Sequence, residues 1–179
     1  FQYIVHDQID ELDLKLPVNI ILEPVANNTA PALTLAALHS IEKHNDNLFI
    51  ILPTDHYFND DNYYSSHITR AIEETKKREI FLFGIKPKRA SSSHGYIKFS
   101  GKNEVKQFEE FIEKPSQAIL NKIIKGNYAW NLGIFIMHPS TWIDLMQKLQ
   151  NDNYGYLLKA WNERQEISNN ITINESDYA

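Results

Sequence analysis

The stretch "LFIILPTDHYFNDD", residues 48–61, decides the fold class. Its first five residues are all apolar, which predicts a short strand buried on both faces. The run stops at Pro53, and a carboxylate, Asp55, follows two residues later. Ligands of open α/β sheets bind beyond the carboxyl ends of the strands, so Asp55 stands where a functional group is expected. The alternative interpretation is that Asp55 only caps the next helix.

Apolar runs and helical spacing alternate along the chain. Strands are predicted at residues 18–22, 48–52, 79–85 and 128–138. A hairpin with its turn near Gly101 is predicted over 95–115, and helices at 32–44, 62–78, 116–126 and in two stretches over 139–165. Strands separated by helices favour parallel order, and the hairpin adds antiparallel pairing. We therefore expect one α/β domain over residues 1–179, Rossmann-like, with a mixed, mostly parallel sheet flanked by helices.

The composition and motifs argue against several classes of protein. The 179 residues are 42% hydrophobic with a net charge of -5, so a sizeable core is expected and a nucleic-acid partner is not. The chain has no cysteine and no apolar run of about 20 residues, which favours a cytoplasmic protein without a membrane partner. No G-x-G-x-x-G follows a predicted strand, which argues against a dinucleotide-binding dehydrogenase. Since the chain starts at Phe1 rather than Met, we expect a piece of a longer protein.

Polar residues also gather after the strand at 18–22. They are Glu23, Asn27, Asn28 and Thr29. The structural interpretation is an Asx turn and helix N-cap before Pro31, and the functional one is a ligand-binding loop beyond the strand end. The residues alone leave both interpretations open.

Two further stretches suggest a sugar-phosphate pocket. In "FIEKP", Glu113 can accept hydrogen bonds from sugar hydroxyls and Lys114 can bind a phosphate. In "YAWNLGIF", Asn131 and Gly133 interrupt an apolar strand, and glycine there indicates a bulge or a close backbone approach. The alternatives are a solvated edge pair and a purely structural bulge. The seven histidines show no metal-ligand spacing.

Seven segments together resemble bacterial mannose-1-phosphate guanylyltransferases. In chain order they are "ILEPVANNTAPALTLAAL", "LPTDH", "FGIKP", "HGYIKF", "FIEKP", "YAWNLGIFIM" and "SDYA". The resemblance extends over essentially the whole chain and implies a nucleotidyltransferase fold. It also implies that GTP and mannose 1-phosphate are converted to GDP-mannose and pyrophosphate with Mg²⁺. Some members carry a fused mannose-6-phosphate isomerase domain of cupin type, and a homo-oligomer is left open.

The resemblance assigns roles by motif. The catalytic residues would be Asp55, Lys114 and Asp177, with Asp55 and Asp177 sharing the metal and Lys114 on the sugar phosphate. The mannose would be lined by Gly95, Tyr96, Glu113 and Asn131. The nucleotide would be bound by Glu23 and by the loop residues Asn27, Asn28, Thr29, Ala30 and Pro31.

Three departures from the family pattern stand out. The family usually has Arg where this chain has Asn27, and its Gly-Tyr-Gly-Tyr pattern reads Ser93-His94-Gly95-Tyr96. We also expect this piece to lack the family's N-terminal Gly-rich phosphate loop and any C-terminal cupin domain. Two alternatives remain open, namely a sugar-1-phosphate nucleotidyltransferase that uses another nucleotide and a non-catalytic module that binds a sugar nucleotide.

Overall fold

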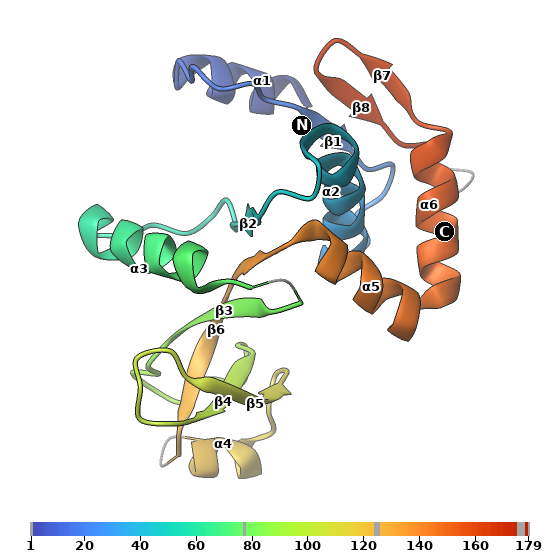
Figure 1. Ribbon diagram of the computed structural model, residues 1–179. Coiled ribbons are helices and arrows are strands. Elements are labelled where there is room, and N and C mark those ends of the chain that lie inside the picture. The colour runs from blue at the N-terminus through green and yellow to red at the C-terminus, as the bar shows by residue number, and fades with distance from the viewer. Residues whose placement is uncertain (1, 77, 124–125, 175–177, 179) are drawn as a thin grey trace. The chain divides into compact units, whose positions relative to one another are not determined.

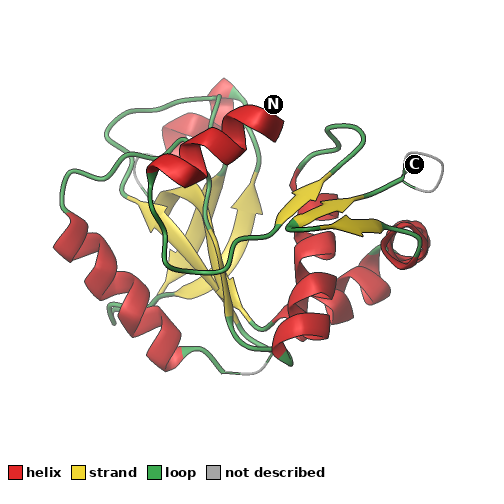
Figure 2. Cartoon of the chain, turned by 90° about the horizontal axis from the view of Figure 1, so that it is seen from above, coloured by secondary structure: helices red, strands yellow, loops and turns green. Residues whose placement is uncertain are grey.

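The computed structural model describes residues 2–76, 78–123, 126–174 and 178 (Figure 1). Its contacts divide the chain into two compact units. The first, here the helical unit, comprises residues 1–47 and 138–179, and the second, the sheet unit, comprises residues 48–137. Helices and strands both contribute, as expected for an α/β protein (Figure 2).

The sheet unit is built around one long strand. Its strands are β2 (Phe49–Ile51), β3 (Ile80–Ile85), β4 (Tyr96–Ser100), β5 (Gln107–Ile112) and β6 (Tyr128–Met137), and its helices are α3 (Asp61–Glu74) and α4 (Gln117–Ile123). The same three residues of β6, 135–137, pair with β2 and with β3, so β6 lies between those two strands. The other half of β6 pairs with β4, which pairs in turn with β5.

Mixed pairing is confirmed by a small sheet in the helical unit, which has one parallel and one antiparallel pairing. The expected predominance of parallel pairing is wrong for the described residues. All pairings described in the sheet unit are antiparallel. Strands β2 and β3 do run in the same direction, as two strands joined through a helix should. They do not pair because β6, which returns from the hairpin, occupies the space between them.

The helical unit holds a small second sheet. Its elements are α1 (Gln2–Glu11), β1 (Ile20–Leu22), α2 (Thr29–His44), α5 (Pro139–Leu149), α6 (Asn151–Asn162), β7 (Gln165–Ile167) and β8 (Asn170–Thr172). Here β1 pairs parallel with β8, and β7 pairs antiparallel with β8. Helix α2 packs on α5 and α6. Neither α1 nor the short strands β7 and β8 were predicted, because these segments are mostly polar or exposed.

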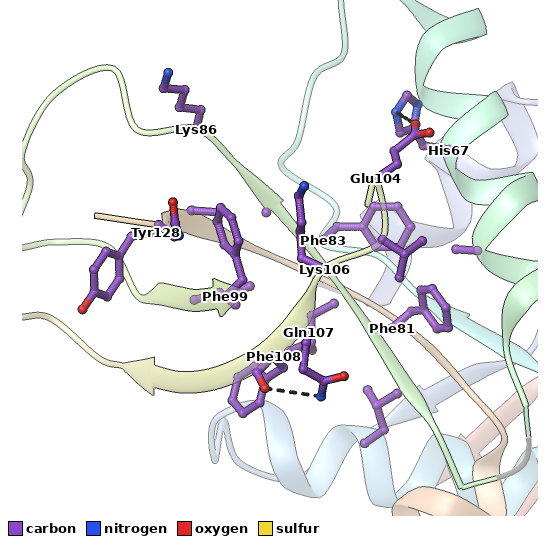
Figure 3. A pocket seen from close by; sticks show the side chains of 18 of the residues that line it. His67, Phe81, Phe83, Lys86, Phe99, Glu104, Lys106, Gln107, Phe108 and Tyr128 are labelled. Atoms are coloured by element: carbon purple, nitrogen blue, oxygen red, sulfur yellow. Dashed lines mark hydrogen bonds and ion pairs between the residues drawn. The ribbon is translucent and has the colours of Figure 1, made fainter. Parts of the chain in front are cut away.

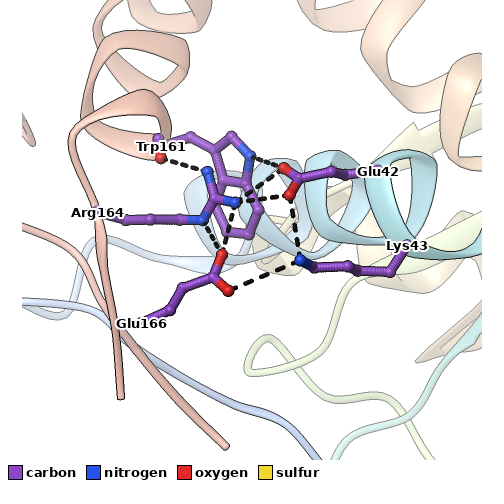
Figure 4. Close-up of polar contacts among 5 residues, drawn as sticks. All are labelled: Glu42, Lys43, Trp161, Arg164 and Glu166. Carbon is purple, nitrogen blue, oxygen red and sulfur yellow. Dashed lines mark hydrogen bonds and ion pairs between the residues drawn. The ribbon is translucent and has the colours of Figure 1, made fainter. Parts of the chain in front are cut away.

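One cluster of charges joins α2, α6 and β7. The Arg164 guanidinium lies 3.9 Å from the centroid of the Trp161 ring and bonds both oxygens of Glu42 at 2.8 and 2.9 Å (Figure 4). Glu166 accepts from Arg164 at 2.8 Å, and Lys43 lies near both carboxylates. Burial tends to raise the pKa of Glu42, but the hydrogen bonds from Trp161 and Lys43 and the charge of Arg164 outweigh it and lower that pKa.

Two details of the predicted elements need correction. The strand that opens the sheet unit is not buried on both faces, because Ile50 is 38% and Leu52 51% exposed. Helix α3 ends at Glu74 with Thr75 as its C-cap, so it is shorter than the helix predicted over 62–78. Within the described ranges, no helix is both long and apolar enough to cross a membrane.

Candidate functional site

Asp55 does not cap a helix. It is exposed in the turn after β2, and the N-cap of α3 is Asp60, whose side chain accepts a 2.9 Å hydrogen bond from the Tyr63 amide. Among the described residues, Asp55 forms no hydrogen bond or ion pair. The helix-cap interpretation of Asp55 is therefore wrong, and its role as a metal ligand stays a prediction.

The loop before α2 also lacks the predicted side-chain cap. Asn28 occupies the N-cap position with φ 60° and ψ -166°, yet its side chain makes no capping bond. The first turn of the helix is instead held by Thr34 in the following turn. Thr34 Oγ1 donates to the Ala30 carbonyl at 2.8 Å and accepts from Trp142 Nε1 at 3.0 Å. Asn27, Asn28 and Thr29 are exposed, while Ala30 and Pro31 are half-buried. The amides at this helix start therefore remain open to an anion.

Glu23 has a partner that the sequence did not reveal. The hydroxyl of Tyr178 donates a hydrogen bond to Glu23 Oε1. Burial, together with this carboxylate, raises the pKa of Tyr178 well above its ordinary value. Tyr178 belongs to the terminal "SDYA" segment, and its place there was the only signal that could have singled it out. Glu23 thus holds Tyr178 within the helical unit.

Three of the residues assigned to the sugar meet in the sheet unit. The backbone amide of Asn131 donates to the Gly95 carbonyl at 2.9 Å, which continues the β4–β6 ladder. A Cβ on Gly95 would lie 2.8 Å from Glu113 Oε2 and 2.7 Å from the Phe111 ring, so the ends of these two side chains lie close over Gly95. The Asn131 side chain turns back to accept from the Gly133 amide at 3.2 Å. Residues that lie far apart in sequence are brought together by strand register.

Tyr96 is the exception in this group. Its side chain is fully buried against Leu120 and Ile123, and its hydroxyl donates to the Ser91 carbonyl and accepts from the Ser91 amide, both at 3.0 Å. The prediction that this side chain lines a sugar pocket is therefore not supported by its position. Tyr96 instead fixes the loop that leads into Gly95.

Lys114 stands on a strained turn. Its φ of 41° is left-handed, which places Lys114 outside the strand alternation, and its Nζ lies 3.8 Å from Glu113 Oε1. Both side chains are more than half exposed, so the pair is loosely held. The backbone turn brings the Glu113 carboxylate and the Lys114 ammonium group close together at the surface.

Of the predicted metal pair, Asp55 and Asp177, the structure describes Asp55. Asp177 lies outside the described residues, and within them no three His, Cys, Asp or Glu side chains cluster as a metal site. A single available carboxylate, Asp55, fits a metal that shares its coordination with substrate phosphates and waters.

A separate cavity of about 880 Å³ lies in the sheet unit between α3 and the sheet strands. Figure 3 shows Phe81, Phe83 and Phe99 along it, with Lys106 beside Phe83 and Tyr128 at the far side. None of the residues predicted for substrate or metal lines it.

Sequence comparison identifies relatives over most of the chain. The chain is 34% identical over 164 residues to mannose-1-phosphate guanylyltransferase RfbM of Salmonella typhimurium and 31% identical over 188 residues to the mannose-1-phosphate guanylyltransferase of Escherichia coli K12. These alignments cover 89% and 99% of this chain but only 34% and 39% of the relatives. The alginate biosynthesis protein AlgA of Pseudomonas aeruginosa is 30% identical, with 99% of this chain and 38% of the relative aligned.

Two solved structures share the fold. A Helicobacter pylori protein described as a mannose-6-phosphate isomerase superposes with a TM-score of 0.87 at 23% identity, over 98% of this chain and 69% of that one. A Thermus thermophilus protein described as a mannose-1-phosphate geranyltransferase gives 0.72 at 23% identity, over 85% and 51%. The family described as Nucleotidyl transferase matches residues 2–172. With nearly the whole chain inside that match, this protein belongs to the nucleotidyl transferase family.

Proposed function

We propose that this chain is part of an enzyme that makes GDP-mannose and pyrophosphate from GTP and mannose 1-phosphate. The observation that carries the proposal is the family match over residues 2–172, together with relatives that are named mannose-1-phosphate guanylyltransferases. The chain spans 34–39% of those relatives, so the activity is proposed for the whole protein that contains it.

The sugar side of the site rests on three neighbours. Glu113 would accept hydrogen bonds from mannose hydroxyls, Asn131 would orient them, and Gly95 would let the sugar approach the backbone. Lys114 would bind the sugar phosphate as a point charge, and its exposure leaves room for that ligand. The close approach of Glu113 to Gly95 supports this assignment.

The nucleotide would be held by the loop at residues 27–31, where an uncapped helix start offers backbone amides. Asp55, and Asp177 with it, would bind Mg²⁺, and the metal would neutralise charge on the phosphates when bound. A phosphate oxygen of mannose 1-phosphate forms the new bond to the α-phosphorus of GTP, and pyrophosphate leaves. That oxygen is already anionic at neutral pH, so no general base among the residues of this chain is needed.

The test is pyrophosphate release by the full-length protein with GTP and mannose 1-phosphate. Asp55→Asn should remove most activity, whereas the matched control Asp60→Asn, which changes a nearby helix-capping carboxylate, should retain it. Full activity of Asp55→Asn would refute the metal role. A panel with UTP, dTTP and ATP separates the other sugar-1-phosphate nucleotidyltransferases, and isomerisation of mannose 6-phosphate tests the bifunctional arrangement.

A non-catalytic sugar-nucleotide module is the alternative from another class. Calorimetry that detects GDP-mannose binding by a protein without turnover would favour it. An exposed Asp55 at a strand end argues for the enzyme, because a binding module has no need of a metal carboxylate there.

A further inference from the structure

His94, where the resembling family has a different residue pattern, makes an aromatic contact that no motif predicts. Its ring stacks on Trp130 with 4.8 Å between the ring centroids and 22° between the ring planes. Its Nδ1 lies 3.0 Å from Ser91 Oγ and 3.2 Å from Ser93 Oγ. Both serines lie in the loop that Tyr96 fixes through its hydroxyl. The ring is therefore held from its edge as well as from its face.

The two stacked residues are sequence neighbours of two of the proposed sugar residues. His94 precedes Gly95, and Trp130 precedes Asn131. Successive residues of a strand point to opposite faces, so Trp130 packs on the core side while Asn131 belongs to the other face. The backbone amide of Asn131 donates to the Gly95 carbonyl at 2.9 Å, and this bond joins the dipeptide His94-Gly95 to the dipeptide Trp130-Asn131.

Packing rather than hydrogen bonding holds Trp130 in place. Its Nε1 is buried and has no hydrogen-bond partner among the described residues. The ring packs against the core cluster of Tyr96, Leu120 and Ile123. No polar contact with a described residue fixes the indole, so packing links it to the loop at residues 91–95: directly through the stacked imidazole of His94, and indirectly through Tyr96, whose hydroxyl bonds Ser91.

We infer that His94 is a positioning residue for sugar-phosphate binding: its stack on Trp130 holds Gly95 against Asn131 and Glu113. The Gly95 carbonyl accepts the 2.9 Å hydrogen bond from the Asn131 backbone amide, and Glu113 Oε2 would lie 2.8 Å from a Cβ on Gly95, so Gly95 is the point where these two residues meet. Loss of the stack lets the loop move away from β6 and opens that contact. The inference rests on the proposed function, because it takes the sugar phosphate as the ligand of these three residues.

The test measures mannose 1-phosphate affinity of the full-length protein by calorimetry and, separately, the KM values of both substrates. His94→Ala should weaken sugar-phosphate affinity by about 3- to 10-fold, the size of one aromatic stack. KM for GTP should not change, and kcat should stay within about 2-fold of wild type. His94→Phe, which keeps a stacking ring, should restore most of the affinity. Ser92→Ala, in the same loop and without a side-chain hydrogen bond among the described residues, should have no effect.

A spectroscopic arm reports on the contact itself. In a background where every tryptophan of the protein other than Trp130 is replaced by phenylalanine, emission from Trp130 should change when His94→Ala removes the stacked ring, and Ser92→Ala should leave it unaltered. Equal sugar-phosphate affinity in wild type and His94→Ala would overturn the inference. Sugar-phosphate binding that depends on His94 in a protein without nucleotidyl transfer would overturn the proposed function alone.

Discussion

Replacement of Arg164 by alanine should destabilise the protein by about 2–3 kcal/mol. The cation–π contact with Trp161 contributes roughly 1 kcal/mol, because the Arg164 side chain is only 13% exposed. Its charge-assisted hydrogen bonds to Glu42 and Glu166 add roughly 1–2 kcal/mol. That figure is discounted because the two carboxylates are 41% and 39% exposed, so water replaces the lost donor.

The assay is urea and thermal denaturation of wild type and variants. For a chain of this length the expected loss corresponds to a fall in Tm of roughly 5–10 °C. Arg164→Lys keeps the charge but loses the planar fork that reaches two carboxylates, so it should fall between wild type and alanine. The matched control is Arg70→Ala, which removes an exposed arginine paired with Glu74 and Glu104 and should change little. The reasoning fails if Arg164→Ala is no less stable than Arg70→Ala.

The same cluster sets a pH dependence. The pKa of Glu42 in the folded protein lies below 4.5, its ordinary value, so its ionised form stabilises the fold. That stabilisation is complete above pH 4.5 and is lost as the pH falls through the lower, folded-state pKa. In Arg164→Ala one of the groups that lowers this pKa is gone. The stability gap between wild type and variant should therefore narrow in acid, and a gap that widens there would contradict the assignment.

Two further predictions concern the helical unit. Asp46→Ala should cost about 1–2 kcal/mol of unfolding free energy, because both Asp46 oxygens accept 2.7 Å bonds from Ser140 at the start of α5, where His138 supplies no side-chain cap. Asp46→Asn should recover part of this loss in a urea titration. Burial, followed by the charges of His44 and Lys43, lowers the pKa of His39 below 6.5, so the unfolded chain binds the proton more readily and stability falls as the pH drops below 6.5. His39→Gln should flatten that slope, and an unchanged slope would exclude His39 as its source.

Local periodicity predicted the existence of most elements, because strand alternation and helical spacing are properties of short windows. The sequence placed α2 and α3 within a few residues of their observed bounds, and α5 and α6 both lie inside the range 139–165, where two helical stretches were predicted. Pairing could not be predicted in the same way, since it depends on which distant strand returns to which edge. The position of β6 between β2 and β3 is such a case: where a mixed but mostly parallel sheet was expected, β2 and β3 each pair antiparallel with β6.

The case of Asp55 shows how a nearby residue, Asp60, excludes one of two interpretations. From sequence, a carboxylate after an apolar run fits a helix cap and a ligand site equally well. The N-cap is Asp60, and all four residues at 59–62 are Asn or Asp, the types that commonly cap helices. Sequence could name the candidates but not the one whose oxygen reaches the Tyr63 amide, because that choice depends on where the helix begins.

The dipeptides Gly95-Tyr96 and Trp130-Asn131 explain why motif matching alone assigned one residue to a position that the structure does not support. Each has one member on the core side, and those members, Tyr96 and Trp130, stand directly opposite each other in the β4–β6 ladder. The other members, Gly95 and Asn131, lie on the opposite face near Glu113. A motif presents both residues of such a pair as functional, whereas the two-residue period of a strand separates them. The assignment of Tyr96 to the sugar pocket ignored that period.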